Sequence, residues 1–318
     1  MKEGKKVRKP GIGRREFFRY SGALTAGAVL GGALSCSKQA DKMAAAHDLM
    51  QEVMKYRKID SHIHVYISHE PERVIKSADL LGIEKLVISR PCVPWKDMAE
   101  GNPEQFRESN DLVLKSMKMY PDRFLGQCTL NPTYQKESFE EIKRCVDAGM
   151  IGLKVYLQVK INNPLYYPII EKCIDLNFMI LMHSNVSLGM GGYRMKYDKG
   201  EYPNTSIPED FVDIAKRYPE AMLQFAHIGG GGDWEYMCKA LKDSPNVWID
   251  TSGSNNEEGQ VDFALKTIGE DRMFFGSDNT FYQSVGRILS ANLTEQQRKK
   301  IFFENYNNIL RRAGNHVS

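Results

Sequence analysis

Short apolar runs recur along the chain between residues 58 and 277, and longer amphipathic segments separate them. Several runs are almost continuous in Val, Ile, Leu, Phe and Met, which is typical of strands buried on both faces of a parallel sheet. The pattern predicts eight strands, at Lys58–Tyr66, Lys85–Arg90, Arg123–Leu130, Ile151–Leu157, Met179–Ser184, Met222–Gly229, Val247–Thr251 and Met273–Ser277.

The segments between the predicted strands have helical periodicity. Polar capping residues, first-turn prolines and a terminal glycine mark the ends of several of them. The predicted helices are Pro71–Gly82, Glu104–Tyr120, Ser138–Ala148, Pro208–Tyr218 and Thr294–Arg312.

Strands that alternate with helices at this spacing predict the α/β class, with a single (β/α)₈ TIM barrel over residues 58–318. A doubly wound sheet is the structural alternative. It would normally carry a glycine fingerprint after its first strand, where this chain has histidines instead. One barrel accounts for the body of the chain, so we expect no second domain.

The first 36 residues are typical of an export signal. A basic region with Arg14, Arg15 and Phe17 precedes an apolar stretch of small residues from Ala23 to Leu34. That stretch is too short for a membrane-spanning helix, which needs about 20 residues. Adjacent arginines followed by phenylalanine resemble the twin-arginine signal for export of folded proteins. A chance arginine pair in a basic leader is the alternative.

Cys36 lies where a bacterial lipoprotein would be cleaved and acylated. Simple cleavage nearby is the alternative, because residues 33–35 match the usual lipoprotein box only in part. Either outcome predicts a bacterial protein that is periplasmic, or attached to the membrane only through a lipid anchor at Cys36. Residues 37–57 are then a linker or a short helix before the barrel.

The net charge of the 318-residue chain is +3, but it is unevenly distributed. Residues 1–36 contain eight lysines and arginines and two glutamates, a net charge of +6, which leaves −3 for the rest. The body therefore has no basic stripe to support nucleic-acid binding. Five cysteines follow the leader without a C-x-x-C pair, so we expect buried thiols rather than a disulfide framework.

Residues suited to metal binding or proton transfer lie at the ends of the predicted strands. His62 and His64 share one side of the first strand, because side chains alternate with a period of two. His183 ends the fifth strand, His227 the sixth and Asp278 the eighth. TIM-barrel enzymes carry their active sites at this end, so the set predicts a metal-binding catalytic site there. A structural histidine pair is the alternative for His62 and His64 taken alone.

With these motifs in this order, the sequence resembles the amidohydrolase superfamily. The resemblance is to the branch of metal-dependent barrel hydrolases and decarboxylases that includes aminocarboxymuconate-semialdehyde decarboxylase. It spans roughly Ile59 to Leu310 and includes His-x-His on strand one, Gly-Leu-Lys on strand four, a histidine on each of strands five and six, and Ser-Asp on strand eight.

The resemblance implies one divalent metal ion, usually Zn²⁺, bound by His62, His64, His183 and Asp278. Zinc lowers the pKa of bound water to roughly 7, which supplies a nucleophile near neutral pH. Asp278 would then be both a ligand and the general base. His227 would polarise or protonate the substrate oxygen; a further metal ligand or a packed core histidine are the alternatives for it.

Three residues are candidates for substrate binding. In the branch matched here, the lysine at the position of Lys154 points to the substrate, where it would hold a carboxylate. A carbamylated Lys154 that bridges two metals, or a lysine that only caps the barrel mouth, are the alternatives. Tyr156 should face the same way and line the pocket. Arg90 ends the second strand and is a second candidate for an anionic group, with a surface arginine as the alternative.

Asp60 precedes the two histidines of the first strand. It could orient His62 or His64 as a hydrogen-bond acceptor outside the metal's own ligands. The alternative is a carboxylate that hydrogen-bonds backbone groups at the floor of the barrel.

The function predicted from these residues is hydrolysis of a small ester, lactone or amide by a metal-bound hydroxide. Decarboxylation of an aromatic or unsaturated acid is the alternative, since the same ligands support it in this family. Export favours hydrolysis, because the branch's known decarboxylases mostly act in the cytosol. A non-catalytic binding lipoprotein ranks behind both, because every expected ligand position is filled. Relatives are often dimers, so a homodimer is a further expectation.

Overall fold

The computed structural model describes residues 49–66, 70–94, 97, 99–184, 203–228, 234–253 and 257–318. The chain divides into two compact units, residues 1–51 and residues 52–318. The predicted export signal, with Cys36, lies outside the described residues. Of the predicted linker, the structure describes residues 49–57, which include the short helix α3 (Leu49–Met54).

All eight predicted strands are confirmed, and they form one parallel sheet in which each strand pairs with the next along the chain. Two backbone hydrogen bonds join the ends of this sheet: Ser61 donates to the carbonyl oxygen of Phe275 at 2.9 Å, and Asp278 donates to that of His62 at 2.7 Å. The sheet is therefore a nearly closed barrel, as predicted. The strands are β1 (Lys58–His64), β2 (Ile83–Ser89), β3 (Phe124–Cys128), β4 (Gly152–Val155), β5 (Met179–Met182), β6 (Met222–Phe225), β7 (Val247–Asp250) and β8 (Met273–Phe274).

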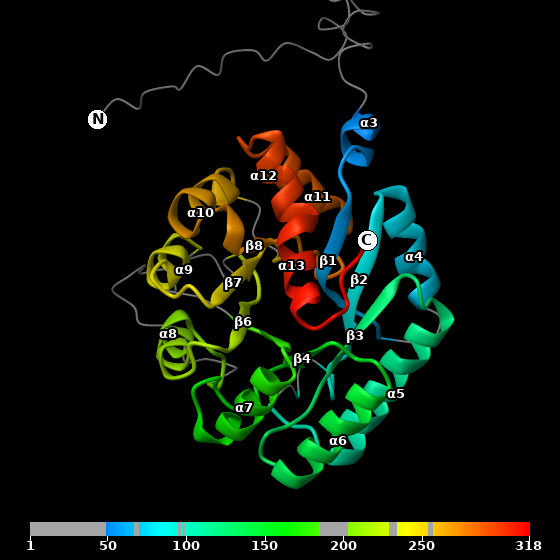
Figure 1. Ribbon diagram of the computed structural model, residues 1–318, viewed down its shortest axis with the longest axis vertical. Coiled ribbons are helices and arrows are strands. Elements are labelled where there is room, and N and C mark those ends of the chain that lie inside the picture. The colour runs from blue at the N-terminus through cyan, green and yellow to red at the C-terminus, as the bar shows by residue number, and fades with distance from the viewer. Residues whose placement is uncertain are drawn as a thin grey trace, which may run out of the picture. The chain divides into compact units, whose positions relative to one another are not determined.

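Helices follow the strands and form a ring around them (Figure 1). Each strand pair therefore has the β–α–β connection that a parallel barrel requires. The helices are α4 (Glu70–Leu80), α5 (Pro103–Met119), α6 (Gln135–Asp147), α7 (Tyr167–Asp175), α8 (Pro208–Arg217), α9 (Trp234–Leu241), α10 (Gln260–Ile268), α11 (Phe281–Ser290), α12 (Glu295–Lys299) and α13 (Asn305–Arg312).

The helix boundaries follow from local chemistry. Asn102 accepts a hydrogen bond from the backbone of Gln105, whose side chain accepts one from the backbone of Asn102, so a capping box starts α5. Thr294 and Gln297 form the same pair at the start of α12. Gly149 follows α6 with φ +89°, a conformation that L side chains rarely adopt.

The segment predicted as one helix over Thr294–Arg312 is divided in the structure. A π-helical turn, Lys300–Glu304, separates α12 from α13. In its midst the carbonyl oxygen of Ile301 accepts a hydrogen bond from the backbone of Phe275, just after β8. The helical periodicity in the sequence could not show this interruption, because it depends on a contact with a distant strand.

An apolar cluster fills the end of the barrel at which the strands begin. Helix α13 and the turn before it supply Phe303, Tyr306, Ile309 and Leu310, which pack against residues from the strands. Figure 1 shows α13 inside the ring of helices. The strand side of the cluster, which we call the floor, comprises Ile59, Val87, Ile151, Met179, Met222, Trp248 and Phe274.

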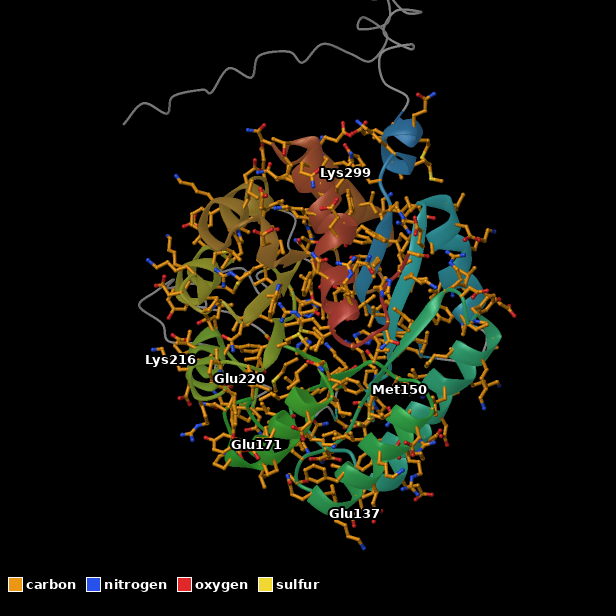
Figure 2. All side chains as sticks on the ribbon, in the orientation of Figure 1. Glu137, Met150, Glu171, Lys216, Glu220 and Lys299 are labelled. Atoms are coloured by element: carbon orange, nitrogen blue, oxygen red, sulfur yellow. The ribbon has the colours of Figure 1, made fainter. Side chains whose placement is uncertain are left out.

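Charged side chains lie mainly on the outer helices, as the labelled Glu171, Lys216 and Lys299 illustrate (Figure 2). The cysteines of the barrel, at positions 92, 128, 145, 173 and 238, are all buried free thiols, as predicted. Within the described ranges, every helix is too short or too polar to cross a bilayer.

Candidate metal centre and active site

His62, His64 and Asp278 meet where β1 and the segment after β8 end. The Nε2 atoms of the two histidines are 3.2 Å apart. Asp278 Oδ1 lies 3.2 Å from His64 Nε2 and 3.9 Å from His62 Nε2. Both imidazoles are buried, while the Asp278 side chain is 32% exposed. The strand alternation therefore brings three of the four predicted ligands together, with one side open.

The backbone at this end adopts conformations that non-glycine residues rarely populate. His227, Asp278 and Asn279 have φ values of +68°, +46° and +66°. Such residues are uncommon and cluster at functional sites, where the surroundings hold them in place. Here Asn279 accepts a hydrogen bond from the backbone of His64 and donates one to its carbonyl oxygen. The strained turn after β8 is thus tied to β1 beside the ligands.

The three side chains fit a divalent metal ion. A tetrahedral ion with bonds of about 2.0–2.1 Å holds its ligand atoms roughly 3.3 Å apart, close to the two 3.2 Å separations observed. His62 Nδ1 lies 3.0 Å from a carboxylate oxygen of Asp250. That carboxylate can only accept, so the proton is on Nδ1 and the lone pair of Nε2 points into the cluster. His62, His64 and Asp278 could therefore hold a metal ion.

His183 and His227 form a second pair beside this cluster. His227 Nε2 lies 3.3 Å from His183 Nδ1, and the ring centroids are 5.1 Å apart. The Nδ1 of His227 is 2.9 Å from the hydroxyl of Ser252 and 3.8 Å from Asp278. The structure thus brings His183 to the same end of the barrel in contact with His227. Its role as the fourth ligand stays a prediction.

Lys154 is fully buried on β4 and faces the metal cluster. Its Nζ lies 3.1 Å from His62 Nε2 and 5.0 Å from the centre of the Tyr156 ring. The hydroxyl of Tyr156 in turn lies 3.5 Å from His64 Nδ1. Both residues therefore line the site from one side, where sequence reasoning had put them.

Arg90 and Asp60 contact backbone groups. Arg90 donates a short hydrogen bond to the carbonyl oxygen of Tyr66 after β1, so its substrate role stays a prediction. Asp60 accepts hydrogen bonds from the backbone of His62 at 3.2 Å and of Ser277 at 2.9 Å. Of the two interpretations of Asp60, the backbone role is the one observed, and Asp250 binds the His62 ring instead.

Burial controls the protonation of this region. Burial, reinforced by the Lys154 ammonium, lowers the pKa of His62 to about 3, and burial also lowers the pKa of His183 and of His227. Burial lowers the pKa of Lys154 to about 8, where it still carries a positive charge at neutral pH. Burial thus disfavours the charged form of all three imidazoles, and the neutral form is the one that binds metals.

The two carboxylates are ionised. Burial opposes the ionisation of Asp278, but its attraction to His62 and the hydrogen bond with His64 lower its pKa well below the usual value. Burial likewise opposes ionisation of Asp250, and the attraction and hydrogen bond of His62 again prevail, so its pKa is lowered. Two negative charges therefore face the imidazoles and Lys154.

Asp250 is the functional candidate that sequence reasoning missed. It ends β7, is fully buried, and contacts His62, His227, Ser252 and Gln224. A carboxylate at the carboxyl end of an otherwise apolar barrel strand was the available signal. Ser89, 3.0 Å from His64 Nδ1, was missed as well, because a strand-end serine carries no distinctive pattern.

Comparison with known proteins gives a family and a fold. The family model described as amidohydrolase matches residues 59–307, most of the chain. The 2-amino-3-carboxymuconate-6-semialdehyde decarboxylase of Dictyostelium discoideum is 24% identical in an alignment over 214 residues that covers 58% of this chain and 58% of that protein. The match thus spans little more than half the length of this curated relative.

Solved structures share the barrel. The 2,6-dihydroxybenzoate decarboxylase from Rhizobium superposes with a TM-score of 0.62 and 19% identity, over 80% of this chain and 99% of that one. A dihydroxybenzoic acid decarboxylase from a Polaromonas species, with bound manganese and the inhibitor 2-nitroresorcinol, gives a TM-score of 0.60 and 20% identity, over 82% and 99%. The family match, which covers both the His-x-His motif and Asp278, identifies the chain as a member of the amidohydrolase family and an enzyme of the amidohydrolase superfamily.

Proposed function

We propose that this enzyme is a metal-dependent decarboxylase that removes CO₂ from a small aromatic or unsaturated carboxylic acid. The observation that carries the proposal is the buried Lys154 ammonium, 3.1 Å from His62 Nε2 and beside the His62–His64–Asp278 cluster. A buried cation next to a metal site is suited to a substrate carboxylate. The relatives named above, which are called decarboxylases, support this choice.

The roles of the residues follow from their positions. Lys154 Nζ binds the carboxylate, and the Tyr156 ring beside it supplies an apolar wall for a planar substrate. Exclusion of water from the bound carboxylate would favour the loss of its charge as CO₂. A divalent ion held by His62, His64 and Asp278 would supply Lewis acidity that withdraws electrons from the substrate.

The electron pair of the broken carbon–carbon bond stays on the substrate carbon, which must then receive a proton. Asp278 is the group placed to deliver it, because its side chain remains partly exposed beside the metal cluster, 3.8 Å from His227 Nδ1. Asp278 is ionised, so it first takes a proton from an acidic group of the substrate or from water. It then returns that proton to the carbon.

Hydrolysis of an ester, lactone or amide, favoured by the sequence alone, is the weaker candidate. Its main argument was export, which rests on a leader outside the described residues, whereas the relatives support the decarboxylase alternative. The metal we propose is Zn²⁺ or Mn²⁺, and the manganese in one relative supports the second. Export, the lipid anchor at Cys36 and a homodimer remain predictions.

The test is a substrate panel for the purified full-length chain, loaded with Mn²⁺ or with Zn²⁺. Hydroxybenzoates and unsaturated diacids, labelled with ¹³C in the carboxyl group, are followed by release of ¹³CO₂, beside a matched panel of lactones and amides. The proposal expects CO₂ from at least one acid, and none after chelation. Turnover of a lactone or amide with no CO₂ from any acid would contradict it.

A further inference from the structure

Asp250 receives five hydrogen bonds beside the metal cluster. Its Oδ2 accepts from His62 Nδ1 at 3.0 Å and from Gln224 Nε2 at 2.9 Å. Its Oδ1 accepts from the backbone of His227 at 3.0 Å, from the backbone of Ser252 at 3.1 Å and from the Ser252 hydroxyl. All of these groups are buried.

We propose that Asp250 is a positioning residue that fixes which ring nitrogen carries the proton on His62, His227 and His183. The inference concerns the metal site on which the proposed function rests, but its test needs no substrate. A failure of the decarboxylase proposal would therefore leave it standing, and its own failure would leave the decarboxylase proposal open.

The first step concerns His62. An ionised carboxylate can only accept hydrogen bonds, so the nitrogen that faces Asp250 must donate. Nδ1 of His62 therefore carries the proton, and Nε2 presents its lone pair to His64 and Asp278. Carboxylate–histidine–metal arrangements fix the ring in this way and raise its basicity.

The second step passes through Ser252. Its hydroxyl donates its proton to Asp250 Oδ1, so the same oxygen must accept from His227 Nδ1, 2.9 Å away. With the proton on Nδ1, the Nε2 of His227 accepts from His183 Nδ1 at 3.3 Å. The Nε2 of His183 is then left with a lone pair, as the predicted fourth ligand requires. The carboxylate of Asp250 thus determines which ring nitrogen carries the proton in three imidazoles.

His64 provides the internal contrast. Its Nδ1 faces the hydroxyl of Ser89 at 3.0 Å and that of Tyr156 at 3.5 Å. A hydroxyl can donate or accept, so these contacts do not decide where the proton of His64 lies. Metal binding itself can select the tautomer of His64, whereas Asp250 fixes the tautomer of His62 in the metal-free protein.

Substitution of Asp250 by asparagine tests the proposal with an almost isosteric side chain. Two backbone N–H groups face the Oδ1 position, so the amide oxygen must take that place. The NH₂ group then occupies the Oδ2 position and donates to His62 Nδ1. Gln224 can adapt by rotating its amide, because its Oε1 has no hydrogen-bond partner among the residues that the structure describes. His62 can adapt only by moving its proton to Nε2, which blocks the metal-binding lone pair.

The measurements are metal affinity, by competition with a chelator, and the ¹⁵N chemical shifts of the imidazoles in metal-free protein. We expect Asp250→Asn to weaken Mn²⁺ or Zn²⁺ binding by about 10- to 100-fold. We also expect one imidazole, assigned through its loss in His62→Gln, to move its proton from Nδ1 to Nε2. Metal affinity within threefold of wild type, with the proton still on Nδ1, would overturn the proposal.

Two further variants separate positioning from general damage. Gln224→Met removes one hydrogen bond to Asp250 Oδ2 but leaves that oxygen as the acceptor for His62 Nδ1. Metal affinity should therefore stay within threefold of wild type, and the ¹⁵N chemical shifts of His62 should not change. Ser252→Ala removes the hydroxyl that joins Asp250 to His227, together with a 3.4 Å contact to His62 Nδ1. The His227 ring should then populate both tautomers, while His62 keeps its state through Asp250. If Asp250→Asn does not fold, Ser252→Ala remains as a test. An unaltered His227 tautomer in that variant would overturn the proposal that Asp250 sets His227 through Ser252.

Discussion

The two ends of the barrel are built from the same strands but contain opposite chemistry. On β7, Trp248 packs in the apolar floor, and two residues later Asp250 receives five hydrogen bonds beside the metal cluster. On β6, Met222 and Gln224 repeat this change from apolar to polar. A step of two residues, about 6.6 Å along a strand, separates residues that support the fold from residues that perform chemistry.

The backbone differs between the two ends as well. Asp278 and His227, at the functional end, have left-handed backbone conformations held by hydrogen bonds to neighbouring strands. The floor is closed by α13 through apolar contacts. The comparison teaches that the floor contributes apolar packing, whereas the other end holds buried charges and strained backbone. Substitutions at the two ends should separate activity from stability.

The largest effect is expected from Asp278→Asn. The variant removes both a metal-binding oxygen and the group that carries the proton, so kcat/KM should fall by about 10³- to 10⁴-fold. The variant should still fold, because asparagine tolerates the left-handed backbone at position 278. Steady-state kinetics measure the loss of activity, and urea unfolding measures the stability of the variant. Activity near that of wild type would remove Asp278 from the mechanism.

Phe274→Ala is the matching change at the floor. Phe274 is fully buried, stacks on Trp248 with ring centroids 6.1 Å apart and meets the Tyr306 ring at 5.1 Å. Loss of a buried phenylalanine should lower the free energy of unfolding by about 3 kcal/mol. The kcat of the protein that remains folded should stay within about twofold. A large loss of kcat without a change in stability would break the division between the two ends.

Lys154→Met tests the substrate side of the functional end. A hydrogen bond to a charged group contributes about 1.5–3 kcal/mol, so kcat/KM for the accepted acid should fall by roughly 10- to 100-fold. Metal affinity should hold or rise, because a buried cation 3.1 Å from His62 is removed. Steady-state kinetics measure kcat/KM, and metal titration of the same variant measures its metal affinity. A loss of metal binding would instead favour the carbamylated bridging role of Lys154.

The smallest effect concerns Lys58 and is seen only as a pH dependence. Its buried ammonium donates to the carbonyl oxygens of Val53 at 2.5 Å and Tyr56 at 2.7 Å, and burial lowers its pKa to about 8. Between that value and the ordinary 10.5 the unfolded chain binds more protons, so the wild type gains stability as pH rises.

The measurement for Lys58 is urea unfolding of wild type and Lys58→Met across this pH range. The free energy of unfolding of wild type, relative to Lys58→Met, should increase by about 1–2 kcal/mol from pH 8 to pH 9.5. A flat difference between the two proteins would show that Lys58 keeps its proton throughout.

Much of the fold was predictable because it depends on local patterns. Short apolar runs, several of them almost continuous, marked the strands, and the capping residues Asn102 and Thr294 marked where helices begin. The short helices α9 and α10 offered too few turns for a clear period. The π-helical turn before α13 depends on the backbone contact between Ile301 and Phe275, which no local pattern reveals.

The candidate site was predictable where its residues alternate on one strand or end a strand. His62, His64 and Asp278 meet as expected. The role of Asp250 was not predictable, because it depends on which ring atom of His62 faces β7 across the barrel. The same limit applied to Asp60, whose neighbours along the chain could not show that its acceptor atom binds backbone groups.

The central claim is that the end of the barrel where the strands finish holds a catalytic metal ion. Calorimetric titration of chelator-treated full-length protein with Mn²⁺ and with Zn²⁺ tests it most directly, with Phe274→Ala and His62→Gln measured beside wild type. The account predicts one equivalent of metal per chain for wild type and for Phe274→Ala, and no tight binding for His62→Gln. Absence of binding in wild type, or undiminished binding in His62→Gln, would contradict it.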